Sequence, residues 1–165
     1  MIDAGKWIGY CEKASPELLG IPEANAGKGG FTVFAEMAGL PQGLPWCAIF
    51  VHAVLGRPDV LGKAHPGTRV LARRMRRKKL WRERDYCPEA GDIVFLRNPG
   101  SRKIDHCGIV ESCDGESVVS VEGNAFDERG RFPAAAGGVV ARRKRARADA
   151  RIVGYGAVGK MIKGD

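Results

Sequence analysis

The amino-acid sequence predicts an α+β fold, with helices from the N-terminal half packed on an antiparallel β-sheet of about five to six strands. Apolar residues recur at helical spacing as far as residue 79, and period-two runs separated by turn residues follow from residue 91. Helices followed by a run of strands are typical of the α+β class. With 165 residues, 44% of them hydrophobic, the chain is long enough to form one domain with its own core.

The individual elements follow from these patterns. Glycine, proline and polar clusters separate the apolar runs and set the expected boundaries. The expected helical ranges are 3–14, 17–20, 31–38, 45–55 and 68–79, and the expected strands are 91–96, 104–113, 117–123, 138–143 and 152–158. The basic stretch 142–151 is predicted to be a loop inside the domain, because a strand follows it.

The central stretch of the sequence is the apolar run that follows Pro45. Proline suits the entry to a helix, and a run that is apolar nearly all round predicts a buried helix. Cys47 then lies in the first turn, where free N–H groups and the macrodipole favour a nucleophilic thiolate. The alternative is that Cys47 is only a small buried apolar residue.

A cysteine nucleophile needs a base, and the chain has three histidines. His52 lies about 140° around the helix from Cys47 and cannot easily face it. His65 lies in a loop bounded by glycine and proline. Strand alternation places His106 on one face with Gly108, where the missing side chain leaves room for another group to approach the ring. Cys107 is expected on the opposite face.

Glu122 and Asn124 interrupt a β-rich run and, being two residues apart, share a face. One interpretation is that a polar side chain here orients His106, as the third member of a catalytic triad does. The other is that both residues start a turn with Gly123.

The charge of the chain restricts its possible partners. The net charge is +8, and the basic residues are concentrated in 69–84 and 142–151. Such a surface attracts polyanions, or it is a solvated face without a specific partner.

Five cysteines without a Cys-x-x-Cys pair do not suggest a disulfide scaffold or a zinc site. We expect no membrane span and no signal peptide, because the first residues lack an apolar segment.

Four short motifs in order resemble the CHAP domain, the cysteine, histidine-dependent amidohydrolase/peptidase family of the papain-like NlpC/P60 superfamily. They are 46–51 around the cysteine, the strand 91–95, the histidine strand 105–110 and the polar strand 121–124. The histidine follows the cysteine by 59 residues, and the two polar residues follow the histidine by 16 and 18. The resemblance covers nearly the whole chain and implies a single catalytic domain over 1–165.

The resemblance implies roles for particular residues. Cys47 is the expected nucleophile, His106 the base, and Glu122 or Asn124 the residue that orients the imidazole. Gln42 is a candidate oxyanion donor together with the backbone N–H of Cys47. Acidic residues near the N-terminus are scattered, so we expect no metal and no cofactor.

The implied function is cleavage of amide bonds in bacterial peptidoglycan, either the N-acetylmuramoyl–L-alanine amide or a peptide bond of the stem or cross-bridge. Basic patches would help on anionic wall polymers. We expect synthesis in the cytoplasm and action on the wall after non-classical release or delivery. Two alternatives are a non-enzymatic nucleic-acid-binding module, which lacks a recognition motif here, and a same-fold amidase acting on a small amide.

Overall fold

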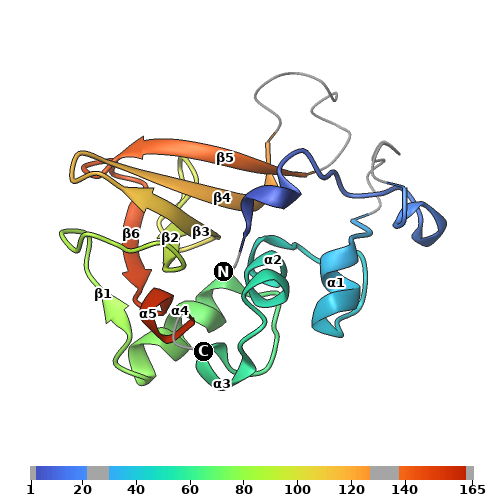
Figure 1. Cartoon of the computed structure of the whole chain (residues 1–165), viewed down its shortest axis with the longest axis horizontal. Coiled ribbons are helices and arrows are strands. Elements are labelled where there is room, and N and C mark those ends of the chain that lie inside the picture. Colours follow the sequence, from blue (N-terminus) through green and yellow to red (C-terminus); the bar gives the residue numbers. More distant parts are fainter. Residues whose placement is uncertain (1–2, 22–29, 127–137, 163–165) are drawn as a thin grey trace.

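The computed structural model describes residues 3–21, 30–126 and 138–162. Within them, six strands form one antiparallel sheet in the order β1-β6-β2-β3-β4-β5, which confirms the predicted α+β class (Figure 1). The strands are β1 (Trp81–Arg82), β2 (Ile93–Leu96), β3 (His106–Cys113), β4 (Ser117–Ala125), β5 (Val139–Ala146) and β6 (Ile152–Gly156). The helices are η1 (Gly5–Trp7) and η2 (Pro16–Leu18), both 3-10, and α1 (Val33–Ala38), α2 (Cys47–Leu55), α3 (Pro58–Leu61), α4 (Thr68–Arg77) and α5 (Gly159–Ile162).

Helix α2 is the centre of the main core and packs directly on β3 and β4. Nearly all of its side chains are buried, as the apolar run predicts. The close approach requires Gly123 in β4, because a Cβ there would lie 2.5 Å from the Cβ of Phe50 and 2.8 Å from the ring of Trp46. Phe34 of α1 stacks on Trp46 from the other side, with ring centroids 5.6 Å apart. The start of α2 is therefore fixed between the sheet and α1.

A second, smaller core lies on the other side of the sheet. Its buried members come from β2, β3, β4 and β6, and they are Val94, Leu96, Val110, Val118, Ile152 and Tyr155. Tyr86, from the segment between β1 and β2, packs on this cluster, with its ring centroid 6.0 Å from that of Tyr155. The sheet thus has an apolar cluster on each face, and Val94 and Phe95 of β2 belong to different clusters.

The predicted helix over 3–14 is wrong beyond one turn of 3-10 helix. Gly9 adopts a φ of 92°, which ends the helical geometry, and the chain then runs beside β5. The Gly9 N–H donates to the Val140 carbonyl at 2.9 Å, and the Val140 N–H donates to the Tyr10 carbonyl at 2.8 Å. Backbone pairing with β5 replaces the helical hydrogen bonds that the spacing of apolar residues indicated.

Other boundaries differ from the prediction by a few residues. Helix α1 begins at Val33 because the Thr32 hydroxyl accepts from the Ala35 N–H at 3.1 Å and caps it. The prediction missed β1, α3 and α5 altogether. The prediction that 142–151 is a loop is wrong in its first half, because β5 continues to Ala146. The residues of this stretch that extend β5 therefore belong to the sheet.

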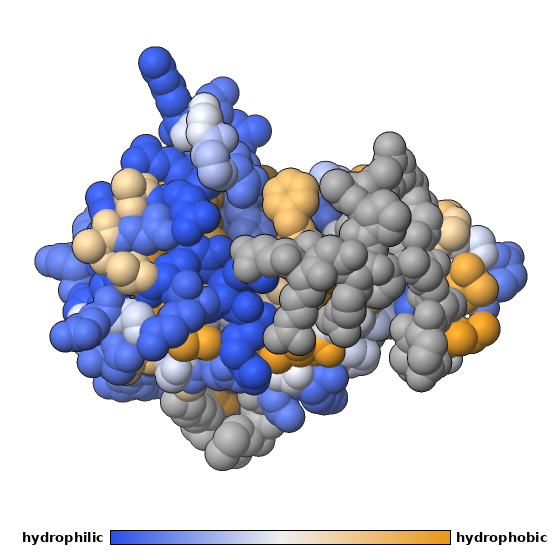
Figure 2. All heavy atoms as spheres, turned by 90° about the horizontal axis from the view of Figure 1, so that it is seen from above, coloured by the Kyte–Doolittle hydropathy of each residue, from blue (hydrophilic) through white to orange (hydrophobic). Residues whose placement is uncertain are grey.

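The surface on the β5 side is largely hydrophilic (Figure 2). Some residues of the basic stretch 69–84 stabilise the fold. The Lys78 ammonium donates to the carbonyls of Asp59 and Val60, each at 2.7 Å. Arg74 donates to the Lys63 carbonyl. These bonds tie α4 to α3 and to the segment after it. Among the residues that the structure describes, no helix is long and apolar enough to cross a membrane.

Candidate active site

Cys47 is the first residue of α2, and its side chain is buried. The preceding Trp46 is held in place because its indole N–H donates to Glu12 Oε2 at 2.8 Å. At this position in the helix, the backbone N–H of Cys47 has no carbonyl of its own helix to bond. The Sγ atom lies 3.3 Å from Oγ1 of Thr68, the first residue of α4. The thiol therefore sits where two helices begin.

His106 is the first residue of β3 and joins Cys47 to a carboxylate. Its Nε2 lies 2.9 Å from Oε2 of Glu122 in β4, and its imidazole also interacts with the Cys47 thiol, which raises the pKa of His106. Because Nε2 contacts Glu122, Nδ1 is left for the thiol. The His106 and Glu122 side chains are 12% and 1% exposed, so their interaction is shielded from water.

The Glu122 carboxylate reaches His106 by passing over Gly108. A Cβ at Gly108 would lie only 2.5 Å from Glu122 Cγ, so a larger residue would displace the carboxylate. The room that the sequence indicated beside His106 is thus filled by Glu122. Two further donors hold the carboxylate from behind. The Ser120 hydroxyl donates to Oε1 at 2.6 Å, and Arg145 of β5 donates to both oxygens, with Nη2 3.0 Å from Oε2.

These contacts separate charge between the thiol and the imidazole. Interactions with Cys107 and His106, including the imidazolium charge, hold the pKa of the Cys47 thiol well below its usual value despite its burial. Burial alone would lower the pKa of His106, but Cys47 and Glu122 raise it to about 9. Burial would likewise raise the pKa of Glu122, but His106 and Arg145 lower it to about 2. These shifts favour a thiolate on Cys47 and an imidazolium on His106.

Sequence reasoning missed four residues of the site: Arg145, Thr68, Cys107 and Ser120, whose hydroxyl donates to Glu122. Arg145 lies in a run so rich in basic residues that its buried partner could not be inferred. Thr68 is 21 residues from Cys47, and only the packing of α4 brings its hydroxyl to the thiol. Cys107 does face away from His106, in the main core, but that core also contains Cys47. Its contact with Cys47 and its burial raise the pKa of the Cys107 thiol well above its usual value, so it remains protonated and can donate.

The remaining sequence candidates lie elsewhere. Asn124 adopts a φ of 55° at an irregularity in the β4–β5 pairing, and its amide oxygen lies against Gly138. The imidazole therefore donates its hydrogen bond to Glu122 and not to Asn124. The Gln42 amide accepts from the Thr32 N–H at 2.8 Å and donates to the Thr32 carbonyl at 3.0 Å, so it clamps the start of α1. Neither contact bears on the oxyanion role of Gln42, which stays a prediction.

The other two histidines are placed apart from this chemistry. His52 is buried on α2, where burial and then the charge of Arg74 lower its pKa to about 4. His65 Nδ1 accepts from the Gly67 N–H at 2.8 Å and closes a turn before α4. Within the described part of the chain, no group of three or more His, Cys, Asp or Glu side chains is arranged to hold a metal ion.

A comparison with family models identifies the family of the chain. The model of the CHAP domain matches residues 39–124. The chain belongs to the CHAP-domain family. No curated protein matches it. The matched segment contains Cys47, His106 and Glu122, whereas Arg145 lies beyond it. Proteins of this family are generally hydrolytic, which indicates a cysteine- and histidine-dependent amidohydrolase or peptidase.

Proposed function

We propose that this CHAP-domain protein hydrolyses amide bonds of bacterial peptidoglycan with Cys47 as its nucleophile. The observation that carries the proposal is that His106, whose Nε2 lies 2.9 Å from the Glu122 carboxylate, also lowers the pKa of the Cys47 thiol. A thiolate paired with an imidazolium, itself oriented by a carboxylate, is the arrangement that acyl transfer by cysteine requires. The choice of peptidoglycan follows from the family resemblance and from the positive charge of the chain.

The first half of the reaction acylates the enzyme. The Cys47 thiolate attacks the carbonyl carbon of the scissile amide, and the carbonyl oxygen becomes an oxyanion. The backbone N–H of Cys47 is the donor that the start of α2 supplies for this oxyanion. His106 then gives its proton to the leaving amine, the C–N bond breaks, and a thioester forms on Cys47.

The second half restores the enzyme. His106, now neutral, takes a proton from water, and the resulting hydroxide attacks the thioester carbonyl. The C–S bond breaks, the carboxylic acid product leaves, and Cys47 and His106 return to the ion pair. Glu122 keeps the imidazole in one orientation through both halves, because Arg145 and Ser120 fix its carboxylate.

The proposal is tested by digesting purified peptidoglycan and weighing the released fragments. Wild-type protein is expected to release fragments whose masses identify a lactyl–alanine or peptide cleavage, and Cys47→Ala is expected to release none. Cys87→Ala is the matched control, because it removes an exposed thiol. If Cys47→Ala released the same amount of fragments as wild type, the assignment of Cys47 as the nucleophile would be refuted. Activity on small amides, with none on any wall, would instead support a same-fold amidase.

We also propose that exposed basic residues assist by binding anionic wall polymers. Several side chains of α4 face solvent, among them Arg69, Arg73 and Arg77. Attraction between exposed charges is screened by salt over about 10 Å at 0.1 M. Sedimentation of the protein with purified walls should therefore weaken as salt is raised, and an Arg69→Glu/Arg73→Glu/Arg77→Glu variant should bind more weakly at low salt. Salt-independent binding would contradict this role.

A further inference from the structure

Two cysteines outside the active site lie side by side. Cys87 Sγ is 3.1 Å from Cys113 Sγ, although 26 residues separate them in the sequence. Cys87 is exposed and Cys113 is partly buried, whereas the other three cysteines are buried. A small reagent in solution can therefore reach this pair without opening the core.

Both chain segments that carry the pair are held in place by contacts other than the thiols. Arg147 donates to the carbonyl of Asp85, two residues before Cys87, and to the carbonyl of Gly115 at 3.0 Å, two residues after Cys113. The guanidinium of Arg147 thus bridges the segment that carries Cys87 and the segment that carries Cys113. Pro88 further restricts the backbone after Cys87. The two sulfur atoms are therefore held close together by backbone segments that have their own contacts.

The segment that carries Cys87 also covers the second core. Its neighbour Tyr86 packs on Tyr155 and donates its hydroxyl to Asp92 Oδ2 at 3.2 Å. The turn after Cys113 is closed by Asp114, whose carboxylate accepts from the Ser117 N–H at 2.6 Å. A bond between the two cysteines would fasten this cover to the end of β3.

We propose that Cys87 and Cys113 form a disulfide when the protein meets an oxidising environment, and that this bond fixes the segment between β1 and β2 over the second core. The oxidant is a low-molecular-weight disulfide. One cysteine thiolate attacks it and releases one small thiol, leaving a mixed disulfide. The second thiolate attacks the protein sulfur of that mixed disulfide and releases the other small thiol. Two protein thiols are oxidised, and one disulfide is reduced to two thiols.

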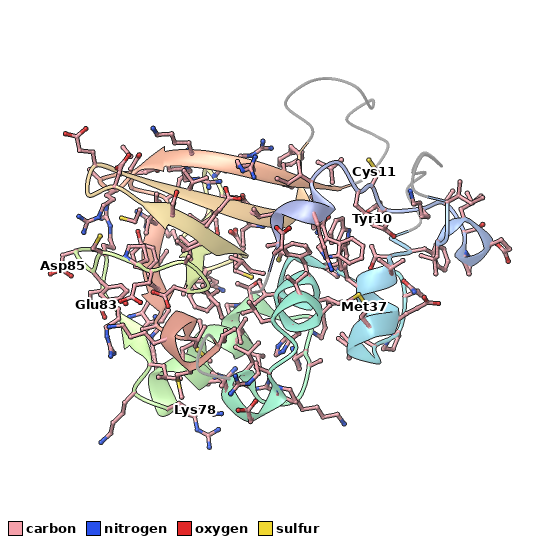
Figure 3. The ribbon with its side chains drawn as sticks, in the orientation of Figure 1. Tyr10, Cys11, Met37, Lys78, Glu83 and Asp85 are labelled. Atoms are coloured by element: carbon pink, nitrogen blue, oxygen red, sulfur yellow. The ribbon has the colours of Figure 1, made fainter. Side chains whose placement is uncertain are left out.

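The cross-link does not depend on the proposed hydrolysis, because the pair lies away from the active site. Asp85, two residues before Cys87, lies at the end of the molecule away from Tyr10 (Figure 3). Tyr10 in turn packs near the start of α2, with its ring centroid 6.5 Å from that of Trp46. Oxidation of the pair is therefore expected to leave the Cys47 site unchanged.

The test is to incubate the protein with oxidised glutathione, block free thiols with N-ethylmaleimide, and map tryptic peptides without reduction. Wild type and Cys11→Ser, the matched control, should yield a peptide linked through Cys87 and Cys113, and Cys87→Ser should not. Cys107 and Cys113 share one tryptic peptide, because no Lys or Arg separates them. A link retained in Cys113→Ser would run through Cys107 and would overturn the assignment.

Thermal unfolding supplies a second measurement. The oxidised wild type should unfold at a Tm about 5–10 °C above that of the reduced protein, because the bond closes a loop in the unfolded chain. Cys87→Ser should show no such difference. Two free, maleimide-labelled thiols at Cys87 and Cys113 after oxidation, or a persistent glutathione adduct on Cys87, would overturn the proposal.

Discussion

Replacing Glu122 by glutamine removes the charge behind His106 while keeping the size of the side chain. In the wild-type site, Glu122 Oε2 lies 2.9 Å from His106 Nε2, and the carboxylate is 1% exposed. Water cannot compensate for the lost charge at such a buried position. The variant should therefore destabilise the imidazolium and, through it, the Cys47 thiolate.

The magnitude follows from the shift of the His106 pKa. A rise from 6.5 to about 9 corresponds to about 3 kcal/mol in favour of the imidazolium. Burial lowers this pKa, so the contributions of Cys47 and Glu122 that raise it together exceed this net value; we assign Glu122, the smaller of the two, at least about 1–2 kcal/mol, or about one pKa unit. The pKa of His106 should fall by about that much in Glu122→Gln, and the pKa of Cys47 should rise by a similar amount.

The assay is the rate of Cys47 alkylation by iodoacetamide between about pH 4 and about pH 10, read by peptide mass spectrometry. In wild type, alkylation should reach its plateau well below the pKa of a free thiol, and in Glu122→Gln the midpoint should lie about one unit higher. Hydrolysis should fall above about pH 9 in wild type, because His106 loses the proton that it gives to the leaving amine. In the variant this fall should begin at lower pH.

Glu111→Gln is the matched control, because Glu111 is a partly exposed carboxylate paired with Arg142 at the surface. It should leave the alkylation midpoint where wild type has it. Circular dichroism at each pH checks that both variants remain folded. An unchanged midpoint in folded Glu122→Gln would refute the reasoning, because Glu122 would then not act on Cys47 through His106.

Three further substitutions test the surroundings of the pair. Thr68→Val removes the hydroxyl 3.3 Å from Cys47 Sγ, so it should raise the alkylation midpoint and lower hydrolysis about 3–10-fold, whereas Thr68→Ser should stay near wild type. Gly108→Ala places a Cβ 2.5 Å from Glu122 Cγ and should lower hydrolysis at least about 10-fold in a protein that still folds by circular dichroism. Unimpaired hydrolysis in Gly108→Ala would contradict the close approach of Glu122 to β3. Arg145→Met should lower the free energy of unfolding in urea by about 3 kcal/mol at neutral pH, because it leaves a buried carboxylate with less charge compensation. That difference should fade as the pH falls from 4.5 towards about 2, because Glu122 then takes up a proton. A difference that persists at about pH 2 would indicate lost packing instead.

The elements that bear the site were predictable because their patterns are local. Pro45 and the apolar run place Cys47 at the start of a buried helix, and strand alternation leaves room beside His106 at Gly108. The same alternation put Glu122 and Asn124 on one face, but the irregularity between β4 and β5 separates them. Sequence alone therefore left two candidates for the residue that orients the imidazole.

The parts that were missed depend on contacts distant in the sequence. The alternation of apolar and polar residues that marks a strand is absent from much of β5, because residues 142–145 are all cationic. The sequence therefore contained no sign that the Arg145 side chain is buried, although it is only 10% exposed. The helical spacing of 3–14 is real, yet Gly9 and pairing with Val140 direct that segment along the sheet. In both cases the decisive partner lies more than 20 residues away.

The most direct test of the account is the fate of Cys47 during turnover. The protein is mixed with purified peptidoglycan fragments, quenched in acid and analysed by peptide mass spectrometry. The account predicts the acyl half of the cleaved amide as a thioester on Cys47, and no fragment release by Cys47→Ala. Fragment release by Cys47→Ala at the wild-type rate, or an acyl group on another residue, would contradict it.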